Sequence, residues 1–143
     1  MHIRLFFDGT VHEGVGYYGY AIEGLLPDGQ LTWGCGKVPP EYFKEFLNEV
    51  VAFHAAIVAL KFLKALPHSW SKEDYLTVVG SMPPLTSGTP GYVQAVQDDL
   101  HDLLKGLGTS GRCTAIPRKD NPALDYVIRA VEQSLPLAEE IVG

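Results

Sequence analysis

The spacing of apolar residues divides the start of the chain into three strand-like segments. Residues 3–7 (IRLFF) form a mostly apolar run, residues 17–25 a second run rich in aromatics, and residues 31–38 (LTWGCGKV) a third. The sequence PDGQ at 27–30 separates the last two, and proline favours the first corner of a turn. Three strands joined by short turns predict an antiparallel meander.

After Pro39 and Pro40 the apolar positions recur every three or four residues, which is helical spacing. The run covers about 24 residues, ends before Pro67, and has as its apolar positions Tyr42, Phe46, Val50, Phe53, Ile57, Leu60 and Leu63. A stripe of small residues lets this helix lie close to a sheet: Ala52, Ala55, Ala56 and Ala59. Residues 74–80 (DYLTVVG) then predict a fourth strand, so the helix is a parallel crossover.

The remainder of the chain alternates between helix and strand. Residues 81–91 (SMPPLTSGTPG) contain three prolines and two glycines and predict a loop. A second helix follows, with its apolar face at Tyr92, Val93, Val96, Leu100, Leu103 and Leu107. Residues 112–117 (RCTAIP) predict a short fifth strand. Asn121 as N-cap and Pro122 at the first helical position open a last helix.

The element order is therefore βββαβαβα over residues 1–143, which we interpret as a single domain. Three strands that pair in sequence, followed by strands alternating with helices, predict an α/β fold. We expect a five-stranded mixed sheet with helices packed against it.

Charge and cysteine content narrow the classes of function. The formal net charge is −6, opposite to the basic surface typical of proteins that bind nucleic acid through their overall field, so any nucleic acid is held by local groups. The two cysteines are far apart and have no metal-ligand spacing. No apolar run reaches the roughly 18 residues of a membrane span. We expect a cytoplasmic protein.

Two aspartates stand out by position, although each has a purely structural interpretation. Asp8 precedes Gly9, and Asp-Gly is a favoured hairpin turn. Asp125 lies in the first turn of the last helix, where the helix dipole favours a negative side chain by roughly 0.3–1 kcal/mol. The alternative is that both are metal ligands, and their placement relative to other motifs favours it.

Four segments resemble, in this order, the ribonuclease H family, specifically its type HI branch. They are the Asp8-Gly9 pair after the first strand, GYAI at 19–22, NEVVAFHAAIVAL at 48–60 and IPRKDNPALD at 116–125. The resemblance covers nearly the whole chain. It implies the RNase H-like fold and descent from Mg²⁺-dependent endonucleases that cleave the RNA strand of RNA–DNA hybrids.

In that family four acids hold two Mg²⁺ ions that activate a water and stabilise the leaving oxygen. The resemblance implies that Asp8 is the first of these acids and Asp125 the last. Both would be catalytic residues and ligands of weakly bound Mg²⁺ or Mn²⁺. The middle two acids are missing, because Ala52 stands at the helix position and Ser81, or Gly80 with a one-residue shift, at the strand position.

Neighbouring acids offer unequal replacements for the missing pair. Glu49 lies one helical turn before Ala52 on nearly the same face, so we include it as a candidate catalytic acid. Asp74 lies six or seven strand residues from the site, about 20 Å, which is too far. We therefore expect cleavage to be weak or absent.

The resemblance also implies substrate contacts. Gly9, Thr10 and Asn48 match positions that approach the nucleic acid, and Arg118 and Lys119 are the best local phosphate clamp. An equally good interpretation of each polar side chain among these residues is that it is an ordinary surface group. The basic segment that the family carries between its middle helices is absent from residues 81–91, which lowers the expected affinity for a hybrid.

Three hypotheses of function remain open. The chain is a binding module for an RNA–DNA hybrid or another nucleic acid with an incomplete active site. Alternatively, it is an active nuclease that uses Glu49, or a variant in which Ala52 replaces a glutamate. The third hypothesis, from another class, is a non-catalytic subunit that assembles with copies of itself or with a protein partner.

Overall fold

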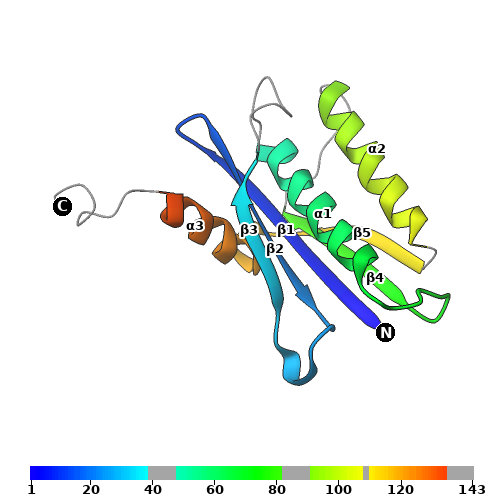
Figure 1. Cartoon of the computed structure of the whole chain (residues 1–143). Coiled ribbons are helices and arrows are strands. Elements are labelled where there is room, and N and C mark those ends of the chain that lie inside the picture. The colour runs from blue at the N-terminus through cyan, green and yellow to red at the C-terminus, as the bar shows by residue number, and fades with distance from the viewer. Residues whose placement is uncertain (39–47, 82–90, 108–109, 135–143) are drawn as a thin grey trace.

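The structure is a computed structural model that describes residues 1–38, 48–81, 91–107 and 110–134 (Figure 1). Its main elements are β1 (His2–His12), β2 (Val15–Glu23), β3 (Thr32–Lys37), α1 (Asn48–Ala65), β4 (Tyr75–Ser81), α2 (Gly91–Gly106), β5 (Ser110–Ile116) and α3 (Ala123–Ser134). Short 3₁₀ turns lie at η1 (Pro27–Gly29) and η3 (Arg118–Asp120). The predicted order βββαβαβα is confirmed. The predicted first part of α1, residues 42–47, and most of the predicted loop at 81–91 lie outside the described residues.

The five strands form one mixed sheet in the order β3-β2-β1-β4-β5. β1, β2 and β3 pair antiparallel as a meander, whereas β4 pairs parallel with both β1 and β5. β1 is thus the central strand, with an antiparallel neighbour on one side and a parallel neighbour on the other. The helices α1 and α3 contact β1, α1 on one face of the sheet and α3 on the other.

Helices cover both faces of the sheet, as Figure 1 shows: α1 and α2 lie on one face and α3 on the other. Alternate residues of β1 explain this arrangement, since successive strand side chains point to opposite faces. Leu5 and Phe7 belong to the large apolar cluster with the buried alanines of α1, whereas Phe6 packs in a second cluster with Ala123 of α3. The alanine stripe predicted to lie close to a sheet is buried there at Ala55, Ala56 and Ala59.

Two glycines allow the helices to approach the centre of the sheet closely. A Cβ atom on Gly9 would lie 2.5 Å from the backbone nitrogen of Ala52 in α1, and one on Gly19 would lie 2.7 Å from the backbone nitrogen of Val127 in α3. Both distances are shorter than van der Waals contact. Gly19 pairs directly with Asp8 across β1 and β2. Both helices therefore pass next to the Asp8-Gly9 segment, one on each face.

The interpretation of Asp8-Gly9 as a hairpin turn is wrong. β1 continues to His12, and Asp8 and Gly9 pair with Gly19 and Tyr18 in the middle of the β1–β2 ladder. The turn instead lies at Glu13 and Gly14, which both adopt positive φ values of 51° and 77°. Both dipeptides, Asp8-Gly9 and Glu13-Gly14, end in glycine, which accepts a positive φ most easily, so the local sequence alone does not choose between them.

The opposite end of the sheet contains a second buried carboxylate, Asp74, which immediately precedes β4. It accepts a hydrogen bond from the backbone N–H of Ser71 at 2.9 Å, forms a 3.1 Å hydrogen bond with Nε2 of His68 and forms a 3.1 Å ion pair with the amino group of Met1. The Ser71 bond is the main cause that lowers the pKa of Asp74 to about 2, with burial opposing it and His68 adding to it. Asp74 therefore ties the loop after α1 to the start of the sheet.

Among the described helices, none is long and apolar enough to cross a membrane.

Candidate functional site

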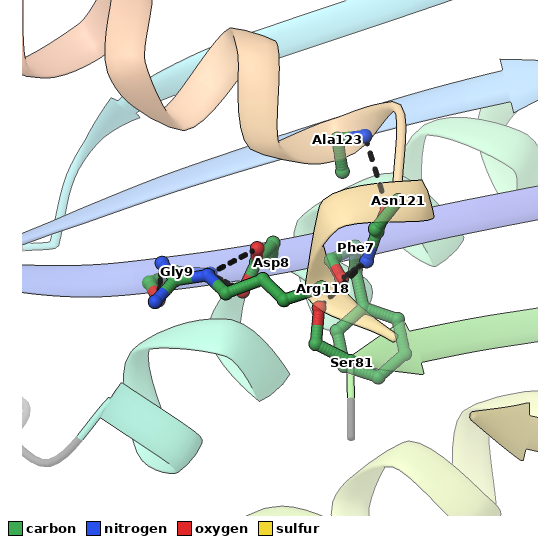
Figure 2. Close-up of polar contacts among 7 residues, drawn as sticks. All are labelled: Phe7, Asp8, Gly9, Ser81, Arg118, Asn121 and Ala123. Atoms are coloured by element: carbon green, nitrogen blue, oxygen red, sulfur yellow. Dashed lines mark hydrogen bonds and ion pairs between the residues drawn. The ribbon is translucent and has the colours of Figure 1, made fainter. Parts of the chain in front are cut away.

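Asp8 is the centre of the candidate site, and Figure 2 shows its polar contacts. The residue is 3% exposed. Its Oδ1 accepts the N–H of Gly9 at 2.8 Å, and its Oδ2 accepts the Nε–H of Arg118 at 3.0 Å. Arg118 also donates from Nη2 to the carbonyl oxygen of Gly9 at 3.2 Å. A buried carboxylate is stable only when it is paired and hydrogen-bonded, and Arg118 supplies the positive charge here.

Asn121 connects the elements around Asp8. Its Nδ2 donates to the carbonyl oxygen of Phe7 at 3.0 Å and to the Oγ of Ser81 at 2.9 Å. Its Oδ1 accepts the N–H of Ala123 at 3.0 Å, which confirms the predicted N-cap of α3. One buried side chain thus joins β1, the end of β4 and the start of α3.

Ser81 rather than Gly80 occupies the position where the family resemblance expects a strand acid on the Asp8 side. In the β1–β4 register Phe6 pairs with Val79, and two further residues along each strand bring Ser81 level with Asp8. Gly80 points to the other face, where a Cβ atom would lie 2.7 Å from the ring of Phe7. The Phe7 ring therefore fills the space that a side chain at position 80 would need.

The helix position of the missing acid lies beside the site. The backbone nitrogen of Ala52 lies against Gly9, so α1 approaches β1 next to Asp8. Its methyl side chain is half-buried beside the large apolar cluster and carries no ligand atom. Asn48 and Glu49 open α1, but their side chains lie outside the described part. Their roles in substrate contact and catalysis stay predictions.

The structure brings Asp8, Gly9 and Arg118 together, and it places Thr10 beside a groove and Lys119 and Asp125 at the surface. A groove of about 480 Å³ lies beside Arg118 and is also lined by Thr10. Lys119 is exposed next to Arg118 in η3. Asp125 is exposed in the first turn of α3.

The buried side of α3 contains Ala123, Val127 and Ala130. Asp125 is two residues from both Ala123 and Val127, and a helix turns by about 100° per residue, so its Cβ lies on the solvent side. Shared metal binding by Asp8 and Asp125 stays a prediction.

The described side chains do not fit a two-metal site. Two divalent ions need several clustered anionic oxygens. In the part of the chain that the structure describes, no group of three or more His, Cys, Asp or Glu side chains is placed to hold a metal ion. At Asp8 itself, a guanidinium and a backbone amide occupy the two carboxylate oxygens. No hydrolytic step through two metal ions follows from this arrangement.

Sequence reasoning missed two contacts that organise this site. Arg118 was a candidate phosphate clamp, but its bond to Asp8 spans 110 residues of sequence. Asn121 was recognised only as a helix cap, and its link to Phe7 and Ser81 was not anticipated. The available signal was the position of both residues in the IPRKDNPALD segment. They follow closely after the end of the predicted fifth strand.

Among the comparisons with known proteins, the search of solved structures found matches, and these support the fold. No family model matches the chain, and no curated protein matches it significantly. Among solved structures, RNase H1 from the halophilic archaeon Halobacterium salinarum NRC-1 is similar with a TM-score of 0.71 and 16% identity, covering 94% of this chain and 100% of that one. An N-terminal RNase H domain from Mycobacterium tuberculosis has a TM-score of 0.64 and 13% identity, covering 94% of this chain and 99% of that one.

A third similar structure is that of LC11-RNase H1 in complex with an RNA/DNA hybrid, with a TM-score of 0.64 and 16% identity, again covering 94% of this chain and 99% of that one. At these low sequence identities, the similarity of this chain to the three structures shows a shared fold and nothing further. The chain has the ribonuclease H-like α/β fold, as the sequence motifs predicted.

Proposed function

We propose that this chain is a nucleic-acid-binding module of the ribonuclease H fold that binds RNA–DNA hybrids and cleaves them weakly or not at all. The observation that carries the proposal is the Asp8–Arg118 ion pair, which places a guanidinium rather than a cluster of acids at the centre of the site. Ser81 and Ala52 stand where two further acids would be needed. Support for the partner comes from LC11-RNase H1, whose structure contains an RNA/DNA hybrid.

The groups available for a nucleic-acid backbone lie on one edge of the site. The side chain of Arg118 is 39% exposed and lines the groove with Thr10. Lys119 adds a second exposed cation beside it. Guanidinium and hydroxyl groups bind phosphate oxygens, and such contacts position a nucleic acid without reading its sequence. Because the chain is acidic overall, these few local contacts carry the electrostatic part of the binding.

Hybrid binding is tested by fluorescence anisotropy with a labelled RNA–DNA duplex and the Lys119→Gln variant. We expect the loss of one phosphate contact to weaken binding and to lower the slope of log K against log salt by about 1. Lys72→Gln is the matched control: it removes the same charge from an exposed lysine near Asp74, at the other end of β4. Equal weakening by both variants would mean that only overall charge matters and would contradict the proposed site.

Cleavage is tested with the same hybrid in the presence of Mg²⁺ or Mn²⁺. We expect cleavage by the wild-type chain to be weak or undetectable. Efficient cleavage that is lost on Asp8→Asn would refute the proposal and favour the active-nuclease hypothesis. Glu49→Gln would then decide whether Glu49 takes part, since unchanged turnover would remove it from the mechanism.

The substituted-acid hypothesis has its own support in the contact between Ala52 and Gly9, which places position 52 beside the site. If Ala52 replaces a glutamate, Ala52→Glu should raise cleavage by orders of magnitude. A role in assembly with copies of this chain or with a protein partner stays a prediction. Size-exclusion mass measurement with and without hybrid addresses it.

A further inference from the structure

Arg118 contacts Asp8 in the place where a nuclease of this fold would need a metal ion. Asp8 is buried and its two oxygens accept different donors, the Gly9 N–H on Oδ1 and the Arg118 Nε–H on Oδ2. Among the described residues, Arg118 is the cationic side chain paired with this carboxylate. The charge of Asp8 is therefore already compensated within the chain.

The backbone holds Arg118 in this position. The carbonyl oxygen of Arg118 accepts the N–H of Asn121 at 3.1 Å, and the side chain of Asn121 donates to Phe7 and Ser81. The guanidinium itself bonds at two points, to Asp8 through Nε and to the Gly9 carbonyl through Nη2. A long surface side chain with one loose contact is easily displaced, whereas this one is anchored at both ends.

A guanidinium and a divalent ion exclude each other at Asp8. Mg²⁺ binds a carboxylate oxygen at about 2.0–2.1 Å and keeps several waters around it. Such an ion on Oδ2 would meet the Arg118 guanidinium, which lies 3.0 Å from the same oxygen and carries like charge. Neither Ser81 nor Ala52 adds an anionic oxygen that would offset this repulsion.

We propose that Arg118 is the resident cation of the Asp8 site, replacing a divalent metal ion, so that this chain binds no metal at Asp8 and binds nucleic acid without one. The second part of the statement rests on the proposed function. The first part concerns the chain alone and is tested without nucleic acid.

The decisive experiment measures thermal unfolding with and without Mn²⁺ for four proteins. They are the wild-type chain, Arg118→Met, Asp8→Asn and the double variant Asp8→Asn/Arg118→Met. Methionine keeps much of the length of arginine but carries no charge, so Arg118→Met leaves Asp8 uncompensated and lowers Tm. We expect Mn²⁺ to raise the Tm of Arg118→Met, because an ion that binds only the folded state stabilises it. Mn²⁺ should have no Asp8-dependent effect on the wild-type chain.

The double variant and Asp8→Asn correct for weak binding of Mn²⁺ to other acids on this acidic chain. A rise in the Tm of the wild-type chain that Asp8→Asn abolishes would overturn the proposal. So would an Arg118→Met variant that Mn²⁺ stabilises no more than it stabilises the double variant.

A second measurement needs no variant and covers the case in which Arg118→Met fails to fold. Mn²⁺ broadens NMR signals of nuclei close to its binding site. We expect the amide signals of Gly9 and Thr10 in the wild-type chain to broaden no more than those of exposed strand residues far from Asp8. Selective broadening of Gly9 and Thr10 would show a metal at Asp8 and would contradict the proposal.

Measurement of hybrid binding then tests the second part of the proposal, that the chain binds nucleic acid without a metal ion. At matched ionic strength we expect the Kd for an RNA–DNA duplex to agree within about twofold between EDTA and Mg²⁺, because Arg118 needs no metal to contact phosphate. Binding that requires Mg²⁺ would contradict this inference while leaving the proposed function intact. Failure to bind under both conditions would refute the proposed function, and the Mn²⁺ results would still decide the role of Arg118.

Discussion

Asp8 and Asp74 are both buried acids associated with neighbouring parallel strands, but the groups that compensate them differ. Asp74 lies before the start of β4, and two of its partners, Ser71 and His68, lie three and six residues away in sequence. Asp8 lies in the middle of β1 and is paired with a residue 110 positions later. The first carboxylate is held by its own loop together with the amino group of Met1, whereas the charge of the second is compensated by a residue far along the chain.

This difference separates a structural acid from a functional candidate. The partners of Asp74 tie a loop and the first residue to one end of the sheet. The partner of Asp8 is a partly exposed arginine beside a groove, at the point where two helices approach β1 from opposite faces. Neither burial nor the exposure of the partners distinguishes the two acids, whereas the position of Arg118 far along the sequence and beside a groove does.

We expect the largest effect on stability from replacing Asn121, whose side chain links the elements around Asp8. Asn121→Ala removes the cap of α3 and leaves the Phe7 carbonyl and Ser81 hydroxyl without their shared donor. We expect a loss of about 2–4 kcal/mol in the free energy of unfolding, measured by urea denaturation. Asn121→Ser can still cap the helix but is too short to reach Phe7 and Ser81, so it should recover about 1 kcal/mol. Equal losses in both variants would mean that the cap contributes little, and an Asn121→Ser variant as stable as the wild type would mean that the bonds to Phe7 and Ser81 contribute little.

The Asp74→Asn variant tests the second buried acid of this comparison through the pH dependence of its stability. The pKa of Asp74 falls from 3.8 to about 2 on folding, so its ionised form stabilises the fold above pH 3.8, and this contribution is lost as pH falls towards 2. We expect the Tm of the variant to lie below that of the wild type at neutral pH and the gap to close between about pH 4 and 2. Ser71→Ala keeps the backbone N–H and should retain the wild-type acid dependence. A gap that persists unchanged at pH 2 would rule out this linkage.

We expect the smallest effect from His54. Its contribution to the pH dependence of stability must be separated from that of Asp74. Burial lowers the pKa of His54 below its usual 6.5, and Lys61 lowers it further; its ring also packs edge-on against Tyr18. An unfolded chain takes up this proton more readily, so stability falls as pH decreases through 6.5. We expect His54→Gln to remove this shallow decline in Tm, whereas His101→Gln, at an exposed position on α2, should leave it in place. A decline that survives in His54→Gln would assign it to another group.

The sequence by itself determined the elements and much of their packing. The alanine stripe of α1 predicted a close approach to the sheet, and Asn121 predicted the start of α3; both are local signals, carried by residue spacing and by capping chemistry. The same local signals left a hairpin turn at Asp8-Gly9 open as an alternative, which is wrong, because they say nothing of how far a strand continues once it has a partner.

Only the tertiary structure decided how the site is arranged. The continuation of β1 through Asp8 depends on its pairing with Gly19, and the choice of Ser81 over Gly80 depends on strand register and on the Phe7 ring. The contact of Arg118 with Asp8 joins residues far apart in sequence. Periodicity and capping act over a few residues, whereas register and ion pairing across the sheet are set when distant segments meet, so no local pattern encodes which side chain reaches a buried carboxylate.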